Sequence, residues 1–208
     1  MLVAVVVTHS VGAHVLDRCL RALVTDGAVD RVALVDTGGA AVVADDLIPD
    51  VDVIALENRG YGAAANVGFA WARERGAQYV ALLNDDAVPR PAWLTALLPE
   101  VDGDVGAAQP ALVSADGLVA SMGVELDPHG AGHDLGDGEP FEPAPPSDLE
   151  IFTGGAVVFS EAFLRSTGGF DERYFLYYED VDLARRGARL GWRYRVVPAS
   201  VVEHDRGT

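Results

Sequence analysis

Short runs of consecutive apolar residues alternate along the first half of the chain with longer segments in which apolar residues recur every three to four positions. A continuous β-branched run is typical of a parallel strand covered on both faces, and the longer spacing is typical of a helix with one buried side. We predict strands at 2–7, 31–35, 51–56 and 79–83, and helices at 13–25, 63–75 and 91–98. This alternation predicts an α/β fold with an open, mostly parallel sheet, in which ligands bind beyond the carboxyl ends of the strands.

The second half of the chain is less regular. Ser160 is a predicted cap of a short helix that ends at Gly168-Gly169, and an acidic helix is predicted at 179–190. Strands are predicted at 107–113, 118–126, 156–159 and 194–197. Between them, residues 127–149 are rich in glycine, proline and acids, which predicts a mobile loop.

The length and composition predict one domain. The chain has 208 residues, of which 50% are hydrophobic, and this is enough for one sizeable core. We therefore expect a single domain over 1–208.

The charge excludes several kinds of partner. A net charge of −17 argues against nucleic acid or an anionic membrane as a direct electrostatic partner, and it implies that a phosphorylated ligand needs a cation. The single cysteine, Cys19, excludes an internal disulfide. The apolar start lacks a basic region and reads as a buried strand, and no run approaches the ~20 apolar residues of a membrane span. We expect a cytoplasmic protein.

Two acidic clusters are the main candidates for chemistry. Asn84-Asp85-Asp86 ends one predicted strand, and Glu179, Asp180 and Asp182 begin the acidic helix. One cluster could hold a divalent cation against phosphates, and the other could take a proton from an attacking hydroxyl. The structural alternative is that acids at a helix start are favoured by the macrodipole and pair with the following arginines. The aromatic residues at 174–178 favour the chemical interpretation, because they would raise a carboxylate pKa toward that of a base.

A glycine motif and several histidines leave alternatives open. Gly60-Tyr61-Gly62 resembles the start of a dinucleotide fingerprint, but it follows the third predicted strand instead of the first. The histidines at 129 and 133, with Asp134 and Asp137, could suggest a metal site. They lie in the predicted loop, however, so exposure to solvent is the simpler interpretation. His204 follows a strand-like pair of valines and could complete a cation site with Asp86, although a surface histidine is the alternative.

Four blocks carry a resemblance to a known family. They are VDTGG (35–39), ENRGYGAAANVGFA (57–70), LLNDDAV (82–88) and a long block from TGGAVVFSEAF at residue 153 to VVEH at residue 204. The chain resembles the family 2 glycosyltransferases, which have the GT-A fold, and especially their rhamnosyltransferase-like branch. The resemblance covers nearly the whole chain, and it implies that residues 1–100 form a nucleotide-binding half and residues 101–208 an acceptor and catalytic half.

The resemblance implies roles for individual residues. Asp36 would accept the N3 proton of a pyrimidine base, and Asp86 and His204 would hold a Mg²⁺ or Mn²⁺ ion at the diphosphate. Asp180 would be the catalytic base, with Glu179 as the second candidate. The remaining residues implied to bind the nucleotide or the donor sugar are Thr8, Asn58, Gly62, Asn66, Asn84, Asp85, Gly154 and Gly155. The family pattern has Asp where this chain has Asn84, which thins the metal's ligand set.

The resemblance also implies a reaction and partners. Members with this motif transfer a sugar from a nucleoside diphosphate to an acceptor hydroxyl with inversion, and rhamnose from a dTDP donor is the leading expectation, with UDP-linked and GDP-linked sugars open. The acceptor would be a lipid-linked glycan, a cell-wall polymer or a small molecule. The protein would contact the membrane peripherally if its acceptor is lipid-linked. A homo-oligomer, or a partner subunit that completes the acceptor site, is also compatible with the resemblance. Many relatives carry helices after this region, so we expect residues 127–149 to act as an acceptor lid here. The alternative function is a nucleotide-sugar-binding subunit without catalysis.

Overall fold

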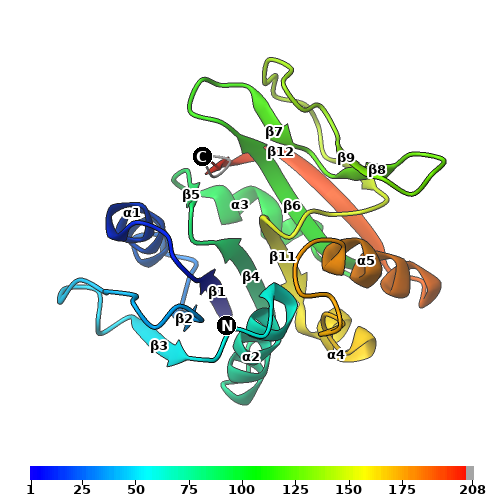
Figure 1. The fold of residues 1–208 in the computed structure, drawn as a ribbon. Helices are drawn as coiled ribbons and strands as arrows, with labels where there is room; N and C mark the ends of the chain where they lie inside the picture. Colours follow the sequence, from blue (N-terminus) through cyan, green and yellow to red (C-terminus); the bar gives the residue numbers. More distant parts are fainter. Residues whose placement is uncertain (205–208) are drawn as a thin grey trace.

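The structure, a computed structural model, describes residues 1–204 and is built around one central sheet (Figure 1). The strand order is β10-β12-β6-β11-β4-β1-β2-β3, with β5 paired to β12 and β7 to β6. The strands are β1 (Leu2–Thr8), β2 (Arg31–Asp36), β3 (Val51–Ala55), β4 (Tyr79–Asn84), β5 (Ala87–Pro89), β6 (Val105–Val113), β7 (Val119–Ser121), β8 (Val124–Leu126), β9 (Gly132–Asp134), β10 (Ser147–Leu149), β11 (Ala156–Ser160) and β12 (Arg193–His204).

The first half of the chain forms the parallel part of the sheet. Strands β3, β2, β1 and β4 are parallel neighbours, joined by α1 (Ala13–Val24) and α2 (Tyr61–Glu74). Beyond β4 the sheet is mixed, because β11 runs antiparallel to both β4 and β6, while β6 and β12 are parallel. The predicted α/β fold with a parallel sheet is therefore confirmed, with an antiparallel strand at its centre.

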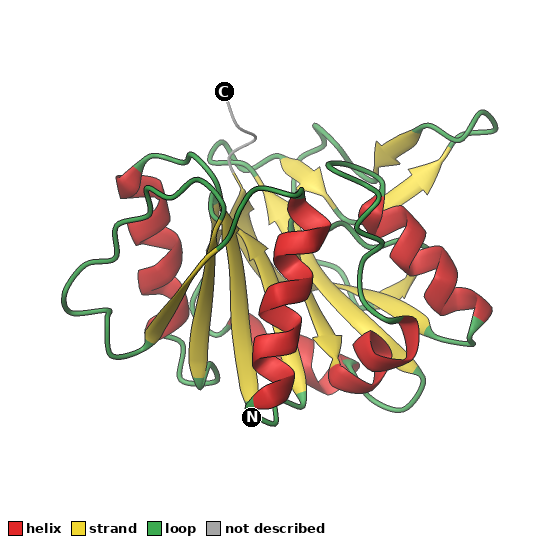
Figure 2. Ribbon diagram, turned by 60° about the horizontal axis from the view of Figure 1, so that its bottom comes forward, coloured by secondary structure: helices red, strands yellow, loops and turns green. Residues whose placement is uncertain are grey.

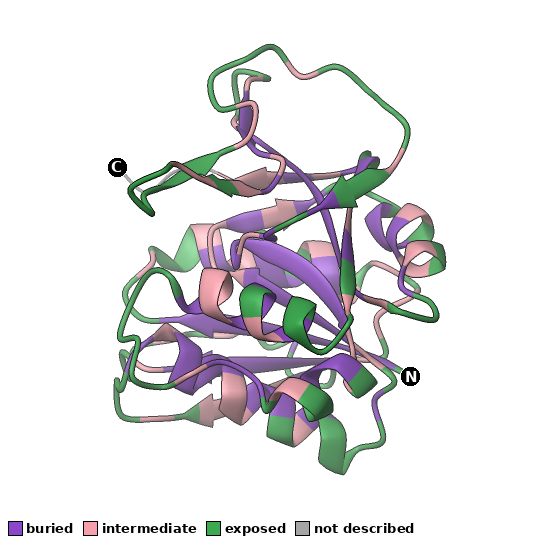
Figure 3. Cartoon of the chain, turned by 90° about the vertical axis from the view of Figure 1, so that its right-hand side faces the viewer, coloured by how far each residue is buried: buried purple, intermediate pink, exposed green. Residues whose placement is uncertain are grey.

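Helices cover both faces of the sheet (Figure 2). Leu2, Ala4 and Val6 of β1 belong to the core cluster that includes α1 and α3 (Trp93–Leu97), whereas the odd-numbered valines of β1 face the cluster with α2. The second cluster also contains residues of α4 (Glu161–Thr167) and α5 (Glu179–Arg189). Figure 3 shows the result, buried strands between helices that are exposed on their outer sides.

Glycine allows α2 to approach the sheet closely. A Cβ atom added to Gly68 would lie 2.2 Å from Val5 Cγ1, a distance that real side chains do not show. The many alanines of α2 serve the same close contact, since Ala64, Ala65 and Ala72 are fully buried against the sheet. Small residues therefore place the start of α2 next to the carboxyl ends of the strands.

Local signals predicted the shorter helices well. Ser160 caps α4 by accepting a hydrogen bond from Phe163 N at 3.2 Å, and Gly168 ends it at φ 79°. The helix expected at 91–98 is shorter and runs from Trp93 to Leu97, followed by a 3₁₀ turn at Leu98–Glu100.

Two strand predictions in the second half need correction. The strand expected at 118–126 is two strands, β7 and β8, because Gly123 at φ 118° breaks the extended chain. The strand expected at 194–197 continues to His204 through a register shift between Val197 and Val201. That shift lies at a proline, which cannot donate to the ladder.

The segment 127–149 is not the irregular loop that its composition predicts. It contains β9, which pairs with β8, and β10, which pairs with β12. The backbone of residues 135–139 also bonds to the segment 119–123, for example from Leu135 N to Gly123 O at 2.8 Å. The prediction of a mobile loop is wrong for these parts, because pairing with distant strands overrides the local composition.

Candidate active site

The parallel strands bring their polar ends to one edge of the sheet. Thr8 at the end of β1 is in register with Asp36 at the end of β2, and Val7 is in register with Asn84 at the end of β4. The antiparallel strand β11 begins at the same edge, where Asn84 N donates to Gly155 O at 3.0 Å. The expected convergence of the strand ends is therefore present.

Two adjoining cavities open at this edge, of about 630 Å³ and about 1230 Å³. Both are lined by Tyr61, Asn84, Asp86 and Leu176, which form the wall between them. The larger cavity, called here the strand-end cavity, is also lined by Thr8, His9, Thr37, Asn58 and Asp85. The smaller one, called the helix cavity, is lined by Gly154, Gly155, Glu179, Asp180 and His204, and by His133 and Asp134 of β9.

Asp86 and His204 meet on the wall between the cavities. His204 Nε2 lies 3.2 Å from Asp86 Oδ1 and 3.2 Å from Asn84 Nδ2. Asp86 Oδ1 is buried and has no hydrogen-bond partner within residues 1–204. A buried carboxylate oxygen without a donor, beside an imidazole, fits a divalent cation that accepts mixed oxygen and nitrogen ligands.

The protein alone offers an incomplete metal site. Within the described part of the chain, no cluster of three or more His, Cys, Asp or Glu residues is arranged to hold a metal ion. The His129 and His133 region does not form such a cluster either, and His133 Nε2 lies 3.7 Å from Asp127 Oδ2. A cation at Asp86 and His204 would therefore need ligand or water oxygens to complete its coordination.

Thr8 and Asp85 form a second polar pair, in the strand-end cavity. Thr8 and the His9 backbone lie close enough to the Asp85 carboxylate to lower its pKa. Burial nevertheless raises the pKa of Asp85, and the neighbouring Asp86 carboxylate adds to the rise.

Asp36 is buried and shapes the loop after β2. Its Oδ1 accepts hydrogen bonds from Gly38 N and Gly39 N, both at 2.9 Å, and its Oδ2 accepts one from Ala41 N at 3.0 Å. Asp36 does not line the strand-end cavity, although its neighbour Thr37 does. In this conformation both carboxylate oxygens accept hydrogen bonds from the loop backbone. The contact with a nucleotide base that the resemblance implies would therefore have to replace one of these bonds.

The residues that the resemblance implies in α2 and in the loop before it divide into two groups. Asn58 lines the strand-end cavity and accepts a hydrogen bond from Gly60 N at 3.0 Å. Gly62 lies against Phe170 and Glu179 and lines neither cavity. Asn66 also lines neither, because its amide bonds the backbone N–H and C=O of Phe170, both at 2.9 Å. Gly62 and Asn66 therefore hold the segment around residue 170 and do not face the cavities.

The two carboxylates at the start of α5 have different environments. Asp180 Oδ2 accepts a hydrogen bond from Gly154 N at 2.9 Å, and Oδ1 accepts one from Val181 N at 2.8 Å. Burial raises the pKa of Asp180, and the Gly154 and Val181 N–H groups oppose the rise. Glu179 is 6% exposed, its Oε2 has no partner within residues 1–204, and burial raises its pKa to about 7. Asp180 is therefore oriented as a carboxylate, whereas Glu179 is held in an environment that favours its neutral form.

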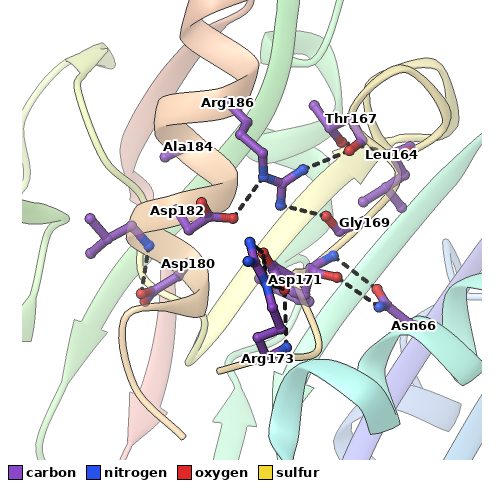
Figure 4. Close-up of polar contacts among 12 residues, drawn as sticks. Asn66, Leu164, Thr167, Gly169, Asp171, Arg173, Asp180, Asp182, Ala184 and Arg186 are labelled. Atoms are coloured by element: carbon purple, nitrogen blue, oxygen red, sulfur yellow. Dashed lines mark hydrogen bonds and ion pairs between the residues drawn. The ribbon is translucent and has the colours of Figure 1, made fainter. Parts of the chain in front are cut away.

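An arginine anchors α5 (Figure 4). Arg186 Nε donates to Asp182 at 2.7 Å, and its two terminal nitrogens donate to Thr167 O at 2.6 Å and Gly169 O at 2.7 Å. The structural interpretation of the acidic helix start is thus correct for Asp182, which pairs with Arg186, and it does not account for Glu179 or Asp180.

The aromatic segment before α5 forms a rim of both cavities. Phe175 lines the strand-end cavity, Tyr177 and Tyr178 line the helix cavity, and all three are exposed. Tyr177 and Tyr178 have φ of 69° and 67°, a left-handed conformation that costs a non-glycine residue about 1 kcal/mol or more. Sequence patterns gave no sign of this strain, nor of Tyr61, whose hydroxyl donates to Gly154 O at 2.8 Å.

Comparisons with known proteins agree with this geometry. The family described as "Glycosyl transferase family 2" matches residues 3–130. The chain belongs to this family. A pre-mycofactocin glycosyltransferase of Mycobacterium tuberculosis is 34% identical over 196 residues, which is 91% of this chain and 40% of the relative. An N-acetylglucosaminyl-diphospho-decaprenol L-rhamnosyltransferase of the same species is 30% identical over 236 residues, 99% of this chain and 76% of the relative.

Solved structures of low sequence identity share the fold of this family 2 glycosyltransferase. GalNAc-T7 with UDP, GalNAc and Mn²⁺ matches with a TM-score of 0.78 and 16% identity over 98% of this chain and 43% of its own. The mannosyltransferase PcManGT of Pyrobaculum calidifontis, with GDP-Man and Mn²⁺, matches with a TM-score of 0.66 and 20% identity over 100% and 57%. The expected GT-A fold is confirmed. The chain spans less than half of the length of the pre-mycofactocin glycosyltransferase.

Two further observations bear on the remaining expectations. None of the helices within residues 1–204 combines the length and the apolar character needed to cross a bilayer. The first backbone N–H of α2, that of Tyr61, donates to Phe175 O at 2.9 Å and so is not free to bind a phosphate in the way of a dinucleotide fingerprint.

Proposed function

We propose that this family 2 glycosyltransferase is an inverting, metal-dependent enzyme that moves a sugar from a nucleoside diphosphate to an acceptor hydroxyl. The observation that carries the proposal is the pair of cavities that share a wall at Asn84 and Asp86. The strand-end cavity has room for the nucleotide, and the helix cavity holds the oriented carboxylate of Asp180. A donor that spans the wall would place its diphosphate at Asp86 and its sugar facing Asp180.

Asp86 and His204 are the proposed protein ligands of the cation, with diphosphate oxygens completing its coordination. A bound Mg²⁺ or Mn²⁺ would neutralise charge on the leaving diphosphate as a Lewis acid. The net charge of −17 supports this role, because a bare diphosphate would be repelled at this site. The Mn²⁺ bound in both structural neighbours supports it as well.

Asp180 is the proposed general base. Its carboxylate takes the proton of the acceptor hydroxyl, the oxygen bonds the anomeric carbon, and the carbon–oxygen bond to the diphosphate breaks with its electrons on the diphosphate. Attack from the face opposite the leaving group inverts the configuration. Glu179, whose pKa burial raises to about 7, remains the second candidate; Asp180 is preferred because the N–H groups of Gly154 and Val181 orient its carboxylate.

The donor and acceptor classes follow from the relatives. An L-rhamnosyl donor and a lipid-linked glycan acceptor are proposed because the 30%-identical relative is named for them. The segment 127–149 is proposed to cover the acceptor, because His133 and Asp134 line the helix cavity and Gly132 N bonds the Tyr178 hydroxyl at 3.3 Å. Peripheral membrane contact would follow from a lipid-linked acceptor.

The test begins with binding. Thermal unfolding is measured with UDP, dTDP and GDP, each with and without Mn²⁺, and a ligand at 100 times its Kd stabilises the folded state by ~2.7 kcal/mol. We expect a metal-dependent rise in Tm for one nucleotide, and loss of that rise in D86N. Stabilisation of the same size without metal, or with D86N, would contradict the metal site.

The catalytic role needs a second measurement. With the donor sugar of the nucleotide that binds, D180N should keep the Mn²⁺-dependent Tm rise and lose transfer or donor hydrolysis by orders of magnitude. The alternative function, a binding subunit without catalysis, predicts instead that wild-type protein and D180N bind equally and that neither turns over the donor.

A further inference from the structure

Tyr61 contacts three parts of the active site at once. It is the first residue of α2, its backbone N–H donates to Phe175 O at 2.9 Å, and its hydroxyl donates to Gly154 O at 2.8 Å. Its ring packs at a tilt against Phe170, with 6.3 Å between the ring centroids. The side chain is also part of the wall that separates the two cavities.

Gly154 lies between Tyr61 and Asp180. Its N–H donates to Asp180 Oδ2 at 2.9 Å, while its carbonyl accepts from the Tyr61 hydroxyl. A Cβ atom on Gly154 would lie 3.6 Å from Tyr61 Cε1 and 3.8 Å from both Cβ and Oδ2 of Asp180. Tyr61, Gly154 and Asp180 are therefore in contact, so a displacement of one of them changes the hydrogen bonds of the others.

We propose that Tyr61 is a positioning residue, whose hydroxyl fixes Gly154 and through it the hydrogen bond that orients the Asp180 carboxylate. This inference rests on the proposed role of Asp180 as the base. It gives a role in the reaction to a residue of the nucleotide-binding half, and so couples the two cavities through one side chain.

The glycine makes this support necessary. The N–H of Gly154 belongs to the peptide group before its Cα and the carbonyl to the peptide group after it, and glycine allows both groups to rotate widely. The second group is held by the Tyr61 hydroxyl at 2.8 Å and by the longer bond from Gly155 N to Thr153 Oγ1 at 3.5 Å, and Gly155 O, which accepts from Asn84 N at 3.0 Å, fixes the next group. Without the Tyr61 hydroxyl, the Gly154 carbonyl loses its hydrogen bond and the glycine regains freedom to turn its N–H away from Asp180.

The charge state of Asp180 reports on the hydrogen bond that Gly154 N donates to its carboxylate. A backbone N–H stabilises the ionised carboxylate and lowers its pKa, whereas burial of Asp180 raises it. The titratable groups that line the helix cavity with Asp180 are Glu179 on its own helix, Tyr61 on α2, Tyr177 and Tyr178 before α5, His133 and Asp134 on β9, and Asp86 and His204 on the shared wall. None of them changes in Y61F except Tyr61 itself, so a weaker Gly154 bond should raise the pKa of Asp180 further.

The experiment compares Y61F with a matched control. Tyr194 also donates its buried hydroxyl to a backbone carbonyl, that of Ala184 at 2.6 Å, and lines neither cavity. The carboxyl ¹³C shift of Asp180 is followed by NMR against pH in the wild type, Y61F and Y194F, with D180N to assign the signal. We expect an upward shift of the Asp180 midpoint in Y61F and none in Y194F, together with similar losses of Tm.

Turnover gives an independent check. With the donor identified by the binding screen, Y61F should lose about 10- to 100-fold in kcat from a misplaced base, with little change in the donor KM. An Asp180 midpoint that stays fixed or falls in Y61F would overturn the inference and leave Tyr61 as packing alone. The proposed function fails separately, if D180N still transfers sugar, so the two failures are distinguishable.

Discussion

The buried carboxyl of Glu179 should make the stability of the protein fall as the pH rises. Burial raises its pKa from the ordinary 4.5 to about 7, and its Oε2 has no hydrogen-bond partner in the described chain. The folded state therefore holds a proton more tightly than the unfolded state does. The contribution to stability is fully present below pH 4.5 and is lost as the pH rises through 7.

The size of the effect follows from the shift. At ~1.4 kcal/mol per pKa unit, the rise from 4.5 to about 7 corresponds to about 3 kcal/mol of stability lost between pH 4.5 and pH 8. In E179Q the neutral amide takes the place of the protonated acid, so this loss should be absent. We expect E179Q to match the wild type near pH 4.5 and to exceed it by up to about 3 kcal/mol at pH 8.

Equilibrium unfolding in urea at several pH values from 4.5 to 8.5 measures this difference. Titrating groups far from residue 179 contribute equally to both proteins, so the difference reports Glu179 together with its neighbour Asp180, whose charge adds to the rise of the Glu179 pKa. E142Q, which removes an exposed carboxylate, controls for the loss of one negative charge. Parallel stability curves for the wild type and E179Q would refute the reasoning, because they would mean that Glu179 is ionised in the fold at no cost.

Three further substitutions test the support of the site. R186M leaves two backbone carbonyls and a carboxylate without their charged donor, and it should lower the free energy of unfolding by about 2–4 kcal/mol in urea titrations. G154A adds a Cβ at ordinary contact distances, 3.6 and 3.8 Å, so its Tm should stay close to that of the wild type while sugar transfer falls because the methyl group enters the helix cavity; a large loss of Tm would contradict this geometry. S160A removes the cap of α4 and should cost about 1 kcal/mol by urea unfolding, with no change in nucleotide binding.

The sequence predicted the features that depend on local signals. The parallel strands were visible as β-branched runs, and the start and end of α4 were visible as Ser160 and Gly168, because each signal acts within a few residues. Strands β9 and β10 were not predictable in this way, since they form only by pairing with β8 and β12.

The candidate site divides along the same line. The acidic clusters and a possible pairing of His204 with Asp86 were visible from residue types, and the resemblance gave each residue an expected role. Three contacts were not visible from residue types: those of Asp36 with its own loop, of Asn66 with the Phe170 backbone and of Tyr61 with Gly154. Each depends on which backbone groups fold against the side chain. Residue type identified the chemistry, and only the tertiary contacts separated residues that face the cavities from residues that support them.

The Asn84–His204 contact joins positions that are 120 residues apart in the chain. Strand β12 pairs with β6, and this pairing places His204, at the end of β12, beside Asp86. Contacts of such long sequence separation form late in folding, because the loop between them must be closed first. The proposed cation site would therefore form only after the sheet is complete, and a partly folded chain with β1, β2, β3 and β4 in place would still lack His204 beside Asp86.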